Sequence, residues 1–572
     1  MKKLPQDSRG STVPAALILV FVLCVLIAVA FELTNGMGRH TQGAGAVEST
    51  VAIADGALDY LYANWRQIAR TSPNLAPSSS EFANIAAPGS SYFPEVQNWT
   101  LKNFGVVAVD PLLQPLPTAT TPPSKQTGRG PGSYSYVYLA SADVEMKLIS
   151  RTVTQKVRRV FQKKVQSPWN FALFYNDSLE IQPSAPLTLT GWVHSNDNLY
   201  TGSDKLTLTD RLTTSGTWSI GYAPGDGAHT GTPTAPNYPA NEPPAQEDTF
   251  QAFGLDPKLL NTSDSNPNND SFREIAEMPN SASPDPLASQ RYYNQAGIKV
   301  IMNGNSVVIR NQSGGVCTAS SKGNDLLIYQ AVTSALKNPT TFQDNREGAT
   351  ISARSIDITP ISSSSMSWNN ILYVTDQSAT ATNHHALRLT NGGTLPKDGL
   401  TFVTDNALYI QGDWNTGASP PSSAATPDST KPMDQSYQWR PSAVVADAIT
   451  LLSNAWQDNN SAKGLNQRTA SNTTINAALV AGNVPTGSKG SNYSGGAENF
   501  VRFLEDWTGK TFTYYGSMLQ LYASAYGIGA WGKANVYLPA QLKWYFDDNF
   551  TLTGPPGTAV MISYVQQRWY QE

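Results

Sequence analysis

One uncharged apolar run near the N-terminus constrains the fold of this chain more than any other feature. It lies within RGSTVPAALILVFVLCVLIAVAFELTNG, residues 9–36, and its 19 residues from Val13 to Phe31 carry no charge. As a helix rising about 1.5 Å per residue, the run reaches roughly 28 Å, close to the hydrocarbon thickness of a bilayer. We therefore predict a transmembrane helix over 11–31, with a core of Val13, Leu17, Val20, Leu23, Leu26 and Phe31.

Three functions compete for this apolar run: a cleaved secretory signal, a permanent membrane anchor, or the first helix of a pilin-like subunit. A secretory signal has a shorter apolar segment of about 7 to 15 residues, followed by a small-residue cleavage site. This run is longer, and the residues from Glu32 onward show no obvious site of that kind. Lys2, Lys3 and Arg9 precede the run, so the positive-inside tendency predicts a cytoplasmic leader over 1–10. The expected location is the inner membrane, single-pass, with the C-terminal bulk periplasmic or extracellular.

A second helical pattern follows the apolar run. Apolar residues recur at alternating spacings of four and three, which predicts an amphipathic helix over 32–70 that continues from the membrane. Two packing partners remain open for this helix: the globular part of the same chain, and the helices of neighbouring subunits. The packing stripe consists of Val47, Val51, Ala54, Leu58, Leu61, Trp65 and Ile68.

The N-terminal residues also carry a family resemblance. A basic leader ending in Gly10, then Ser11 and Thr12, an apolar span and the helix AVESTVAIADGALDYLYANW resemble type IV pilin and pseudopilin-like proteins, specifically the class related to the pilus-assembly protein PilX. The resemblance implies cleavage by a prepilin peptidase between Gly10 and Ser11, methylation of Ser11, and other pilin-like subunits as partners. Ser11 replaces the usual phenylalanine, and Ala15 replaces the usual glutamate, which argues against a major filament subunit.

The rest of the chain has the short alternating runs of β-strands. LTLT, LTLTD and WSIGY are separated by glycine, asparagine, aspartate or serine, and the pattern N-x-L-Y recurs at Asn370–Tyr373 and Asn406–Tyr409. Brief, closely spaced strands are typical of stacked coils. We therefore predict an α+β, mainly β chain, in which the N-terminal helices are followed by a β-rich domain of β-helix or solenoid-like coils with a few short helices.

The expected domain organisation follows these patterns and three segments rich in proline, glycine, serine and threonine. After the helices we expect a membrane-proximal α+β region over 71–167 with a Pro-rich loop at 111–132, a β-rich domain over 168–440 with disordered loops at 223–248 and 415–435, and a C-terminal part over 441–572 with short bracing helices.

The C-terminal part contains one predicted bracing helix. Phe500, Phe503, Leu504 and Trp507 follow helical spacing, and Arg502, Glu505 and Asp506 are expected on its solvated side. Stretches such as YSGGAENFVRFLEDWTGKTFTYYGSMLQLYAS resemble a long exported domain attached to PilX-like N-termini, for which the resemblance implies no activity.

Signatures of catalysis and of metal binding are weak. Cys24 lies in the apolar run and cannot pair with Cys317, which excludes an intramolecular disulfide and a cysteine-ligated zinc cluster. His384 and His385 are adjacent and would point to opposite faces of a strand, and His194 is expected to be a structural imidazole. The acids in turn-like contexts, which we expect to cap backbone amides, are Asp197, Asp376, Asp405 and Asp413.

The sequence therefore favours a protein that is not an enzyme and needs no cofactor or metal. Only 14% of the residues are charged and the net charge is −4, so nucleic acid is not an expected partner. The predicted function is assembly or display of a type IV pilus or secretion pseudopilus, with the inner membrane, prepilin peptidase and pilin-like subunits as partners. The alternative is a membrane-anchored β-helix protein that binds or cleaves polysaccharide, or a surface adhesin; a groove with several aromatics and at least two acids would favour glycan chemistry.

Overall fold

The chain consists of two compact units. The computed structural model describes residues 12–72, 74–127, 133–149, 151–227, 229–255, 259–380, 382–417, 440–484, 493–557, 559–567 and 570–571. The N-terminal unit comprises Met1–Gln126, Tyr136–Lys163 and Val565–Glu572. The second unit, called the β unit below, comprises Thr127–Ser135 and Lys164–Tyr564.

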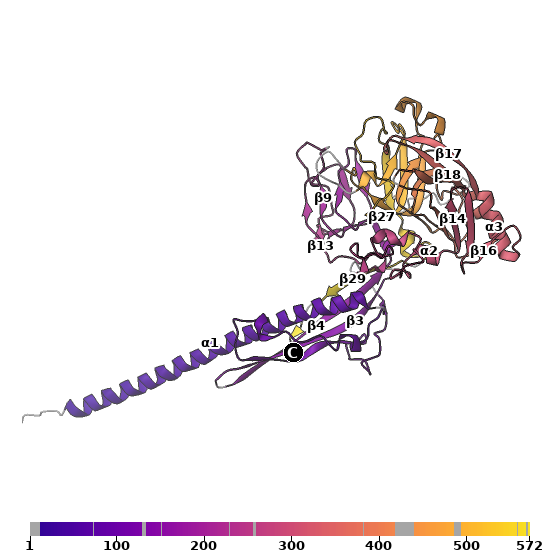
Figure 1. The fold of residues 1–572 in the computed structure, drawn as a ribbon. Coiled ribbons are helices and arrows are strands. Elements are labelled where there is room, and N and C mark those ends of the chain that lie inside the picture. The colour runs from indigo at the N-terminus through magenta and orange to yellow at the C-terminus, as the bar shows by residue number, and fades with distance from the viewer. Residues whose placement is uncertain are drawn as a thin grey trace, which may run out of the picture. The chain divides into compact units, whose positions relative to one another are not determined.

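The N-terminal unit combines one long helix with an antiparallel sheet (Figure 1). Helix α1 runs from Thr12 to Thr71, and its first half extends away from the strands of this unit. The sheet has the order β1-β3-β4-β29, with β2 beside β3 and β30 beside β4. The bounds are β1 Trp99–Ala108, β2 Gln126–Thr127, β3 Tyr134–Lys147, β4 Thr152–Gln166, β29 Met561–Gln566 and β30 Tyr570–Gln571.

The second half of α1 is held by an aromatic cluster and by ion pairs. The Trp65 ring is fully buried, with its centroid 5.4 Å from that of Tyr138 and 5.2 Å from that of Phe161. Arg159 of β4 forms ion pairs with Asp55 and Asp59 on the helix. Burial of the Trp65 side chain removes a large apolar area from water, so this half of the helix is part of the core of the unit.

The expected transmembrane helix is not supported by the structure. Within the described residues, no helix is long and apolar enough to cross a membrane. Helix α1 continues without a break past Glu32.

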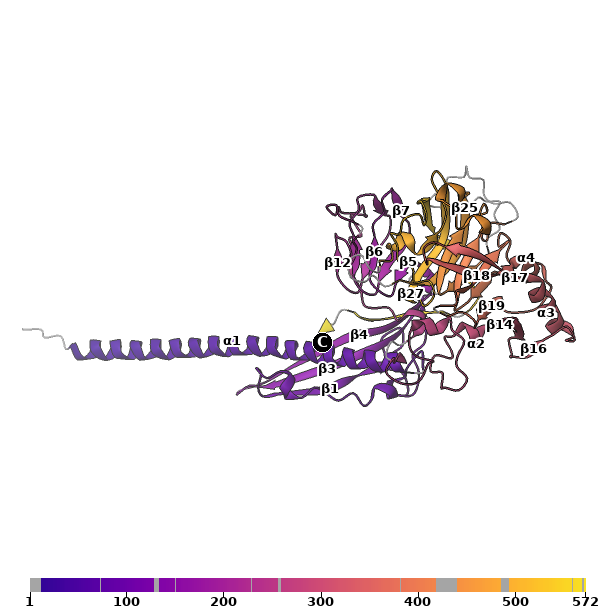
Figure 2. The same cartoon turned by 45° about the horizontal axis from the view of Figure 1, so that its top comes forward.

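The β unit is built from four sheets (Figure 2). The largest has 13 strands in the order β13-β11-β8-β5-β27-β25-β23-β21-β19-β14-β15-β16, with β28 beside β27. Its bounds are β5 Phe171–Tyr175, β8 Trp192–Ser195, β11 Leu212–Thr214, β13 Ala245–Gln246, β14 Ile298–Asn303, β15 Ser306–Asn311, β16 Val316–Cys317, β19 Ile371–Asp376, β21 Leu400–Val403, β23 Ser442–Ala446, β25 Thr473–Asn483, β27 Thr511–Ala523 and β28 Gln541–Phe546.

The other sheets of this unit are smaller. A six-stranded sheet has the order β17-β18-β20-β22-β24-β26, a three-stranded sheet the order β12-β9-β6, and a pair is formed by β10 and β7. Their bounds are β6 Leu179–Ile181, β7 Leu187–Leu189, β9 Leu199–Thr201, β10 Leu206–Leu208, β12 Trp218–Ser219, β17 Leu336–Asp344, β18 Ala349–Asp357, β20 His385–Thr390, β22 Ala407–Gln411, β24 Ala448–Leu452 and β26 Val501–Phe503. The α-helices of the unit are α2 Tyr292–Gln295, α3 Gly323–Ala335 and α4 Ile358–Ser363.

The chain is mostly β, but the expected β-helix or solenoid is wrong. The strands lie in separate sheets, and both large sheets include antiparallel pairs, β14 with β15 and β17 with β18. The short strands predicted at LTLT, LTLTD and WSIGY are present, since β7 and β10 have three residues each and β12 has two, but β25 and β27 have 11 and 13 residues. Strands β23 and β24 are buried at every position, as expected for parallel strands covered on both faces.

The predicted bracing helix around residue 503 is also wrong. The segment forms strand β26, which pairs in parallel with β24. Arg502 and Glu505 are buried rather than solvated: Arg502 pairs with Glu347, and Glu505 accepts a hydrogen bond of 2.6 Å from the Ser453 backbone N–H. Pairing with a distant strand therefore overrides the local helical spacing of the apolar residues.

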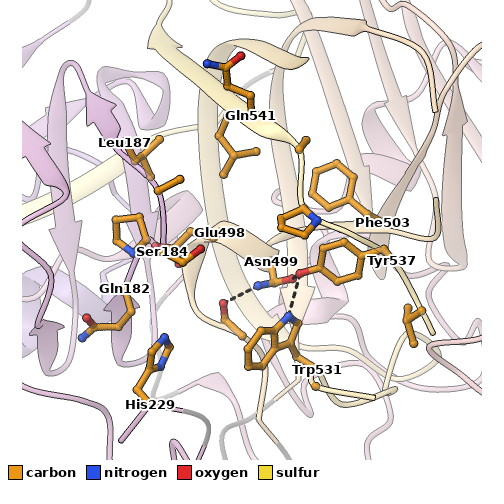
Figure 3. Close-up of a pocket in the computed structure, with 18 of the residues that line it drawn as sticks. Gln182, Ser184, Leu187, His229, Glu498, Asn499, Phe503, Trp531, Tyr537 and Gln541 are labelled. Carbon is orange, nitrogen blue, oxygen red and sulfur yellow. Dashed lines mark hydrogen bonds between the residues drawn. The ribbon is translucent and has the colours of Figure 1, made fainter. Parts of the chain in front are cut away.

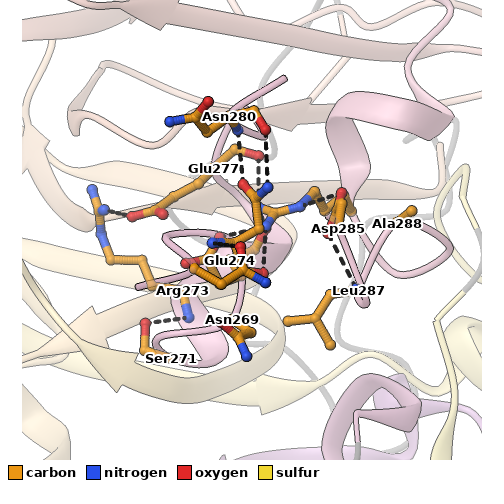
Figure 4. Close-up of polar contacts among 12 residues, drawn as sticks. Asn269, Ser271, Arg273, Glu274, Glu277, Asn280, Asp285, Leu287 and Ala288 are labelled. Atoms are coloured by element: carbon orange, nitrogen blue, oxygen red, sulfur yellow. Dashed lines mark hydrogen bonds and ion pairs between the residues drawn. The ribbon is translucent and has the colours of Figure 1, made fainter. Parts of the chain in front are cut away.

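Arg291 organises the segment between β13 and β14 through its partners Glu274 and Asp285, which Figure 4 labels. Arg291 is fully buried, and its guanidinium lies 2.6 Å from Glu274 Oε2 and 2.8 Å from Asp285 Oδ2. It also donates to the backbone carbonyl oxygens of Asn268, at 2.8 Å, and Glu274, at 2.6 Å. This segment has few strands of its own, so polar contacts of this kind fix its path.

Candidate functional site

A cavity of about 600 Å³ opens in the β unit (Figure 3). One wall comes from the segment after β6 and from the loop that carries His229, and the opposite wall comes from the C-terminal strands and loops. Its aromatic lining residues are Phe503, Trp531 and Tyr537, and its amide lining residues are Gln182, Asn499 and Gln541. The volume fits a small organic ligand.

A chain of hydrogen bonds fixes the aromatic wall. Trp531 Nε1 donates to the Tyr537 hydroxyl at 2.8 Å, and this hydroxyl donates to Asn499 Oδ1 at 2.6 Å. Asn499 Nδ2 in turn donates to the Gly495 carbonyl at 2.7 Å. The rings are therefore held in defined positions with their polar atoms paired, and they offer mainly apolar faces to the cavity.

Arg346 contributes a cation to the lining of the cavity. It donates from Nε to the Gly529 carbonyl at 2.9 Å and from Nη2 to the Ser494 carbonyl at 3.0 Å. Burial, together with the nearby charge of Arg502, lowers the pKa of Arg346 to about 9. The guanidinium therefore remains charged at neutral pH and holds two backbone segments of this wall together.

A group of carboxylates and one imidazole lies at the edge of this cavity. Glu180 of β6, Asp226 and His229 each place one possible metal-ligating atom within 4.8 Å of the others. Glu180 Oε1 accepts a hydrogen bond of 2.9 Å from the Ala223 N–H, and His229 Nδ1 lies 2.5 Å from Asp226 Oδ2. We call Glu180, Asp226 and His229 the Glu-Asp-His cluster.

Burial perturbs the acids of this region. Desolvation, with a further contribution from Asp226, raises the pKa of Glu180 to about 7. Desolvation also raises the pKa of Glu498, another cavity residue, to about 8, with a contribution from Glu180. These carboxyl groups therefore titrate near neutral pH instead of near pH 4.

The acids singled out from the sequence do not converge on one site. Asp376 Oδ1 accepts from the Ser378 N–H at 3.0 Å, and Asp413 Oδ1 accepts from the Thr474 N–H at 2.8 Å. Asp197 Oδ2 accepts from the Ser178 hydroxyl, and Asp405 is half-buried beside Arg273, with its pKa raised by desolvation. None of these four acids is among the described residues that line the cavity.

The histidines singled out from the sequence lie in two separate environments. His194 is fully buried, with Nδ1 2.8 Å from Thr213 Oγ1 and Nε2 3.1 Å from Asn196 Oδ1, and burial lowers its pKa to about 4. The expectation of a structural imidazole is therefore confirmed for His194. His385 Nδ1 lies 3.0 Å from Asp376 Oδ2. His384 and His385 both line a small pocket that shares no lining residue with the cavity.

The predicted N-terminal residues are distributed along α1. Gly10 and Ser11 lie outside the described residues, as do the side chains of Val13 and Leu17. The other predicted membrane-core side chains are exposed, namely Val20, Leu23, Leu26 and Phe31. In the packing stripe Ala54, Leu58, Leu61 and Trp65 are fully buried, Val51 and Ile68 are half-buried, and Val47 is exposed.

Sequence reasoning missed the Glu-Asp-His cluster and Glu498. The one local signal was the Asp226-x-x-His229 spacing inside a segment expected to be a disordered loop. Glu180 and Glu498 lie far from this loop in the sequence, and they approach it only through the arrangement of β6 and the turn before β26.

Comparisons with known proteins give little to identify the chain. No protein-family model matches it, and no curated protein matches it. Among solved structures, the competence-associated pilin ComZ from Thermus thermophilus aligns over 91% of this chain and 97% of its own length, with 11% sequence identity and a TM-score of 0.24. This distant structural neighbour is a pilin, but a TM-score this low does not show a shared fold.

Proposed function

We propose that this chain is a minor pilin-like subunit that acts in assembly or display of a type IV pilus or secretion pseudopilus, without catalysis of its own. The observation that carries the proposal is the division of α1 into two halves. The second half is packed into the N-terminal unit, whereas the first half leaves large apolar side chains exposed. The resemblance of the N-terminal residues to pilin-like proteins supports the same assignment.

The exposed half of α1 needs an apolar partner. Between Leu19 and Met37 the exposed apolar side chains surround the helix, and Leu19, Phe21 and Met37 are each at least 70% exposed. Burying a side chain of this size contributes about 1.5 to 3 kcal/mol, so leaving the whole segment in water is unfavourable. The occupants that we propose for this surface are the first helices of neighbouring pilin-like subunits, which would cover it from several sides.

Photo-crosslinking in cells tests this packing. The test variant carries a photoreactive amino acid in place of Leu26, which is 59% exposed on α1. The control variant carries the same amino acid in place of Leu112, which is 79% exposed in a loop of the same unit. We expect Leu26 to form adducts that mass spectrometry identifies as pilin-like subunits or second copies of this chain, and we expect no such adducts from Leu112. Absence of pilin-like adducts from Leu26 would refute the proposal.

Maturation is the second part of the proposal. We propose that a prepilin peptidase cuts between Gly10 and Ser11 at the inner membrane and that the bulk of the chain lies outside the cytoplasm. Mass spectrometry of the N-terminus from purified membranes should then find methylated Ser11. An intact Met1, or a cut beyond Phe31, would contradict this maturation, and replacement of Gly10 should block it.

A second candidate function is the binding of a saccharide in the cavity. The cavity combines three aromatic residues with neutral amides, a lining suited to a ligand with apolar faces and hydroxyl groups. Calorimetric titration of the full chain with neutral oligosaccharides tests it, comparing Trp531→Ala with Trp368→Ala, which lies outside the cavity lining. Saccharide binding that is lost only in Trp531→Ala would support this function, and absence of binding to the wild-type chain would contradict it.

A further inference from the structure

The Glu-Asp-His cluster has no part in the packing of α1, yet it gathers charge in the interior of the β unit. Glu180 is 5% exposed and Asp226 is 9% exposed, so both carboxylates are largely removed from water. Their ligating atoms and that of His229 lie within 4.8 Å of one another. Placing two carboxylates so close together in a buried site costs free energy unless a positive charge compensates them.

The oxygen atoms of the cluster are not all satisfied by the protein. Glu180 Oε2 is buried without a hydrogen-bond partner, and Glu498 Oε1 at the same edge of the cavity is in the same state. Within the described residues, no lysine or arginine forms an ion pair with Glu180 or Glu498. A buried carboxylate oxygen without a protein donor is open to a further ligand.

We propose that Glu180, Asp226 and His229 bind a divalent metal ion of the zinc class. One imidazole nitrogen and two carboxylate oxygens form a mixed donor set that Zn²⁺ accepts, and three protein ligands leave a fourth position for water or another group. A dication also compensates the two negative charges of the carboxylates. Calcium fits less well, because it prefers an oxygen-only set of six to eight ligands.

The ion would link separate parts of the β unit. Glu180 belongs to β6, whereas Asp226 and His229 belong to a loop whose backbone contacts Glu180 through the Ala223 N–H. The direct contact between His229 Nδ1 and Asp226 Oδ2 holds the two loop residues together. Because His229 and Glu498 line the cavity, the bound ion would lie at its wall (Figure 3).

Metal binding to the full chain tests the proposal. The protein is purified in detergent micelles, freed of metal with a chelator and titrated with ZnCl₂ by calorimetry, with CaCl₂ as the comparison. We expect one Zn²⁺ per chain, an upward shift of the thermal midpoint, and no comparable effect of Ca²⁺. His229→Gln and Glu180→Gln should each weaken zinc binding by more than about tenfold.

Matched variants keep the result interpretable. His384→Gln and Asp264→Asn change a histidine and an acid of the same unit outside the cluster, and both should bind Zn²⁺ as the wild-type chain does. Co²⁺ provides an independent readout, because its visible absorption reports nitrogen ligation and should change in His229→Gln. Absence of stoichiometric zinc binding, binding that survives His229→Gln, or a preference for Ca²⁺ would each overturn the proposal.

Discussion

Replacing Arg291 with methionine tests how far buried polar contacts stabilise the β unit. Arg291 is fully buried, and both of its carboxylate partners are shielded, with side-chain exposures of 3% for Glu274 and 14% for Asp285. Arg291→Met keeps the side chain apolar and buried, but it removes the cation of both ion pairs and the donor to the backbone carbonyl groups of Asn268 and Glu274. Removing one partner of a buried ion pair costs about 3 to 5 kcal/mol, because the other charge stays desolvated.

The expected loss can be converted into a thermal shift. The entropy of unfolding is near 2.1 cal/mol/K per residue, which gives about 0.8 kcal/mol/K for a unit of roughly 400 residues. A loss of about 3 to 5 kcal/mol therefore lowers the midpoint of thermal unfolding by about 4 to 6 °C. Differential scanning calorimetry of the full chain measures this midpoint. Hydrogen exchange should localise the loss to the segment between β13 and β14.

An exposed ion pair of the same unit provides the control. Lys337 Nζ lies 3.7 Å from Asp357 Oδ2, and the lysine side chain is 49% exposed. Such a pair contributes about 0 to 1 kcal/mol, so Lys337→Met should shift the midpoint by roughly 1 °C or less. If Arg291→Met shifted the midpoint no more than Lys337→Met, the reasoning from burial would be refuted.

Two further predictions concern packing and pH. Trp65→Ala should lower the free energy of unfolding of the N-terminal unit by about 3 to 5 kcal/mol, because it opens a cavity between α1 and the sheet. Denaturant unfolding followed by circular dichroism measures this loss, which should exceed the loss for Trp99→Ala at a half-buried position. For His194, a folded-state pKa of about 4 against 6.5 means that the unfolded chain binds more protons between these values. The contribution of His194 to the free energy of unfolding is therefore fully present above pH 6.5, and it falls by up to roughly 3 kcal/mol towards pH 4. His194→Phe should reduce the change of the free energy of unfolding with pH over this range, and an unchanged pH dependence would contradict the attribution to His194.

Local sequence patterns predicted part of the fold correctly. The asparagines of the repeated N-x-L-Y pattern directly precede β19 and β22, and Asn370 has a positive φ of 60°, which asparagine tolerates better than most residues. Spacings of three and four along α1 include Leu58, Leu61 and Trp65, which are fully buried. These features depend on neighbours within one or two turns of the chain, so a single sequence contains them.

Long-range pairing explains where the sequence patterns misled. The apolar spacing from Phe500 to Trp507 is helical, but the segment forms β26 because β24 offers it a parallel partner. The expected coils were inferred from short strands, whereas β25 and β27 have 11 and 13 residues and pair in parallel along the whole of β25. Strand pairing between distant segments leaves no periodic signal in either segment alone.

The sequence by itself determined that the chain is mostly β and that its N-terminal part contains an uncharged apolar run followed by an amphipathic stripe, because composition and side-chain spacing express these properties locally. Only the tertiary structure decided which half of α1 is covered and which residues share the cavity. Glu180, His229 and Glu498 come from three distant segments, and the order of strands in the sheets brings them together. A cluster of this kind depends on distances in space, which a single sequence does not encode in any local pattern.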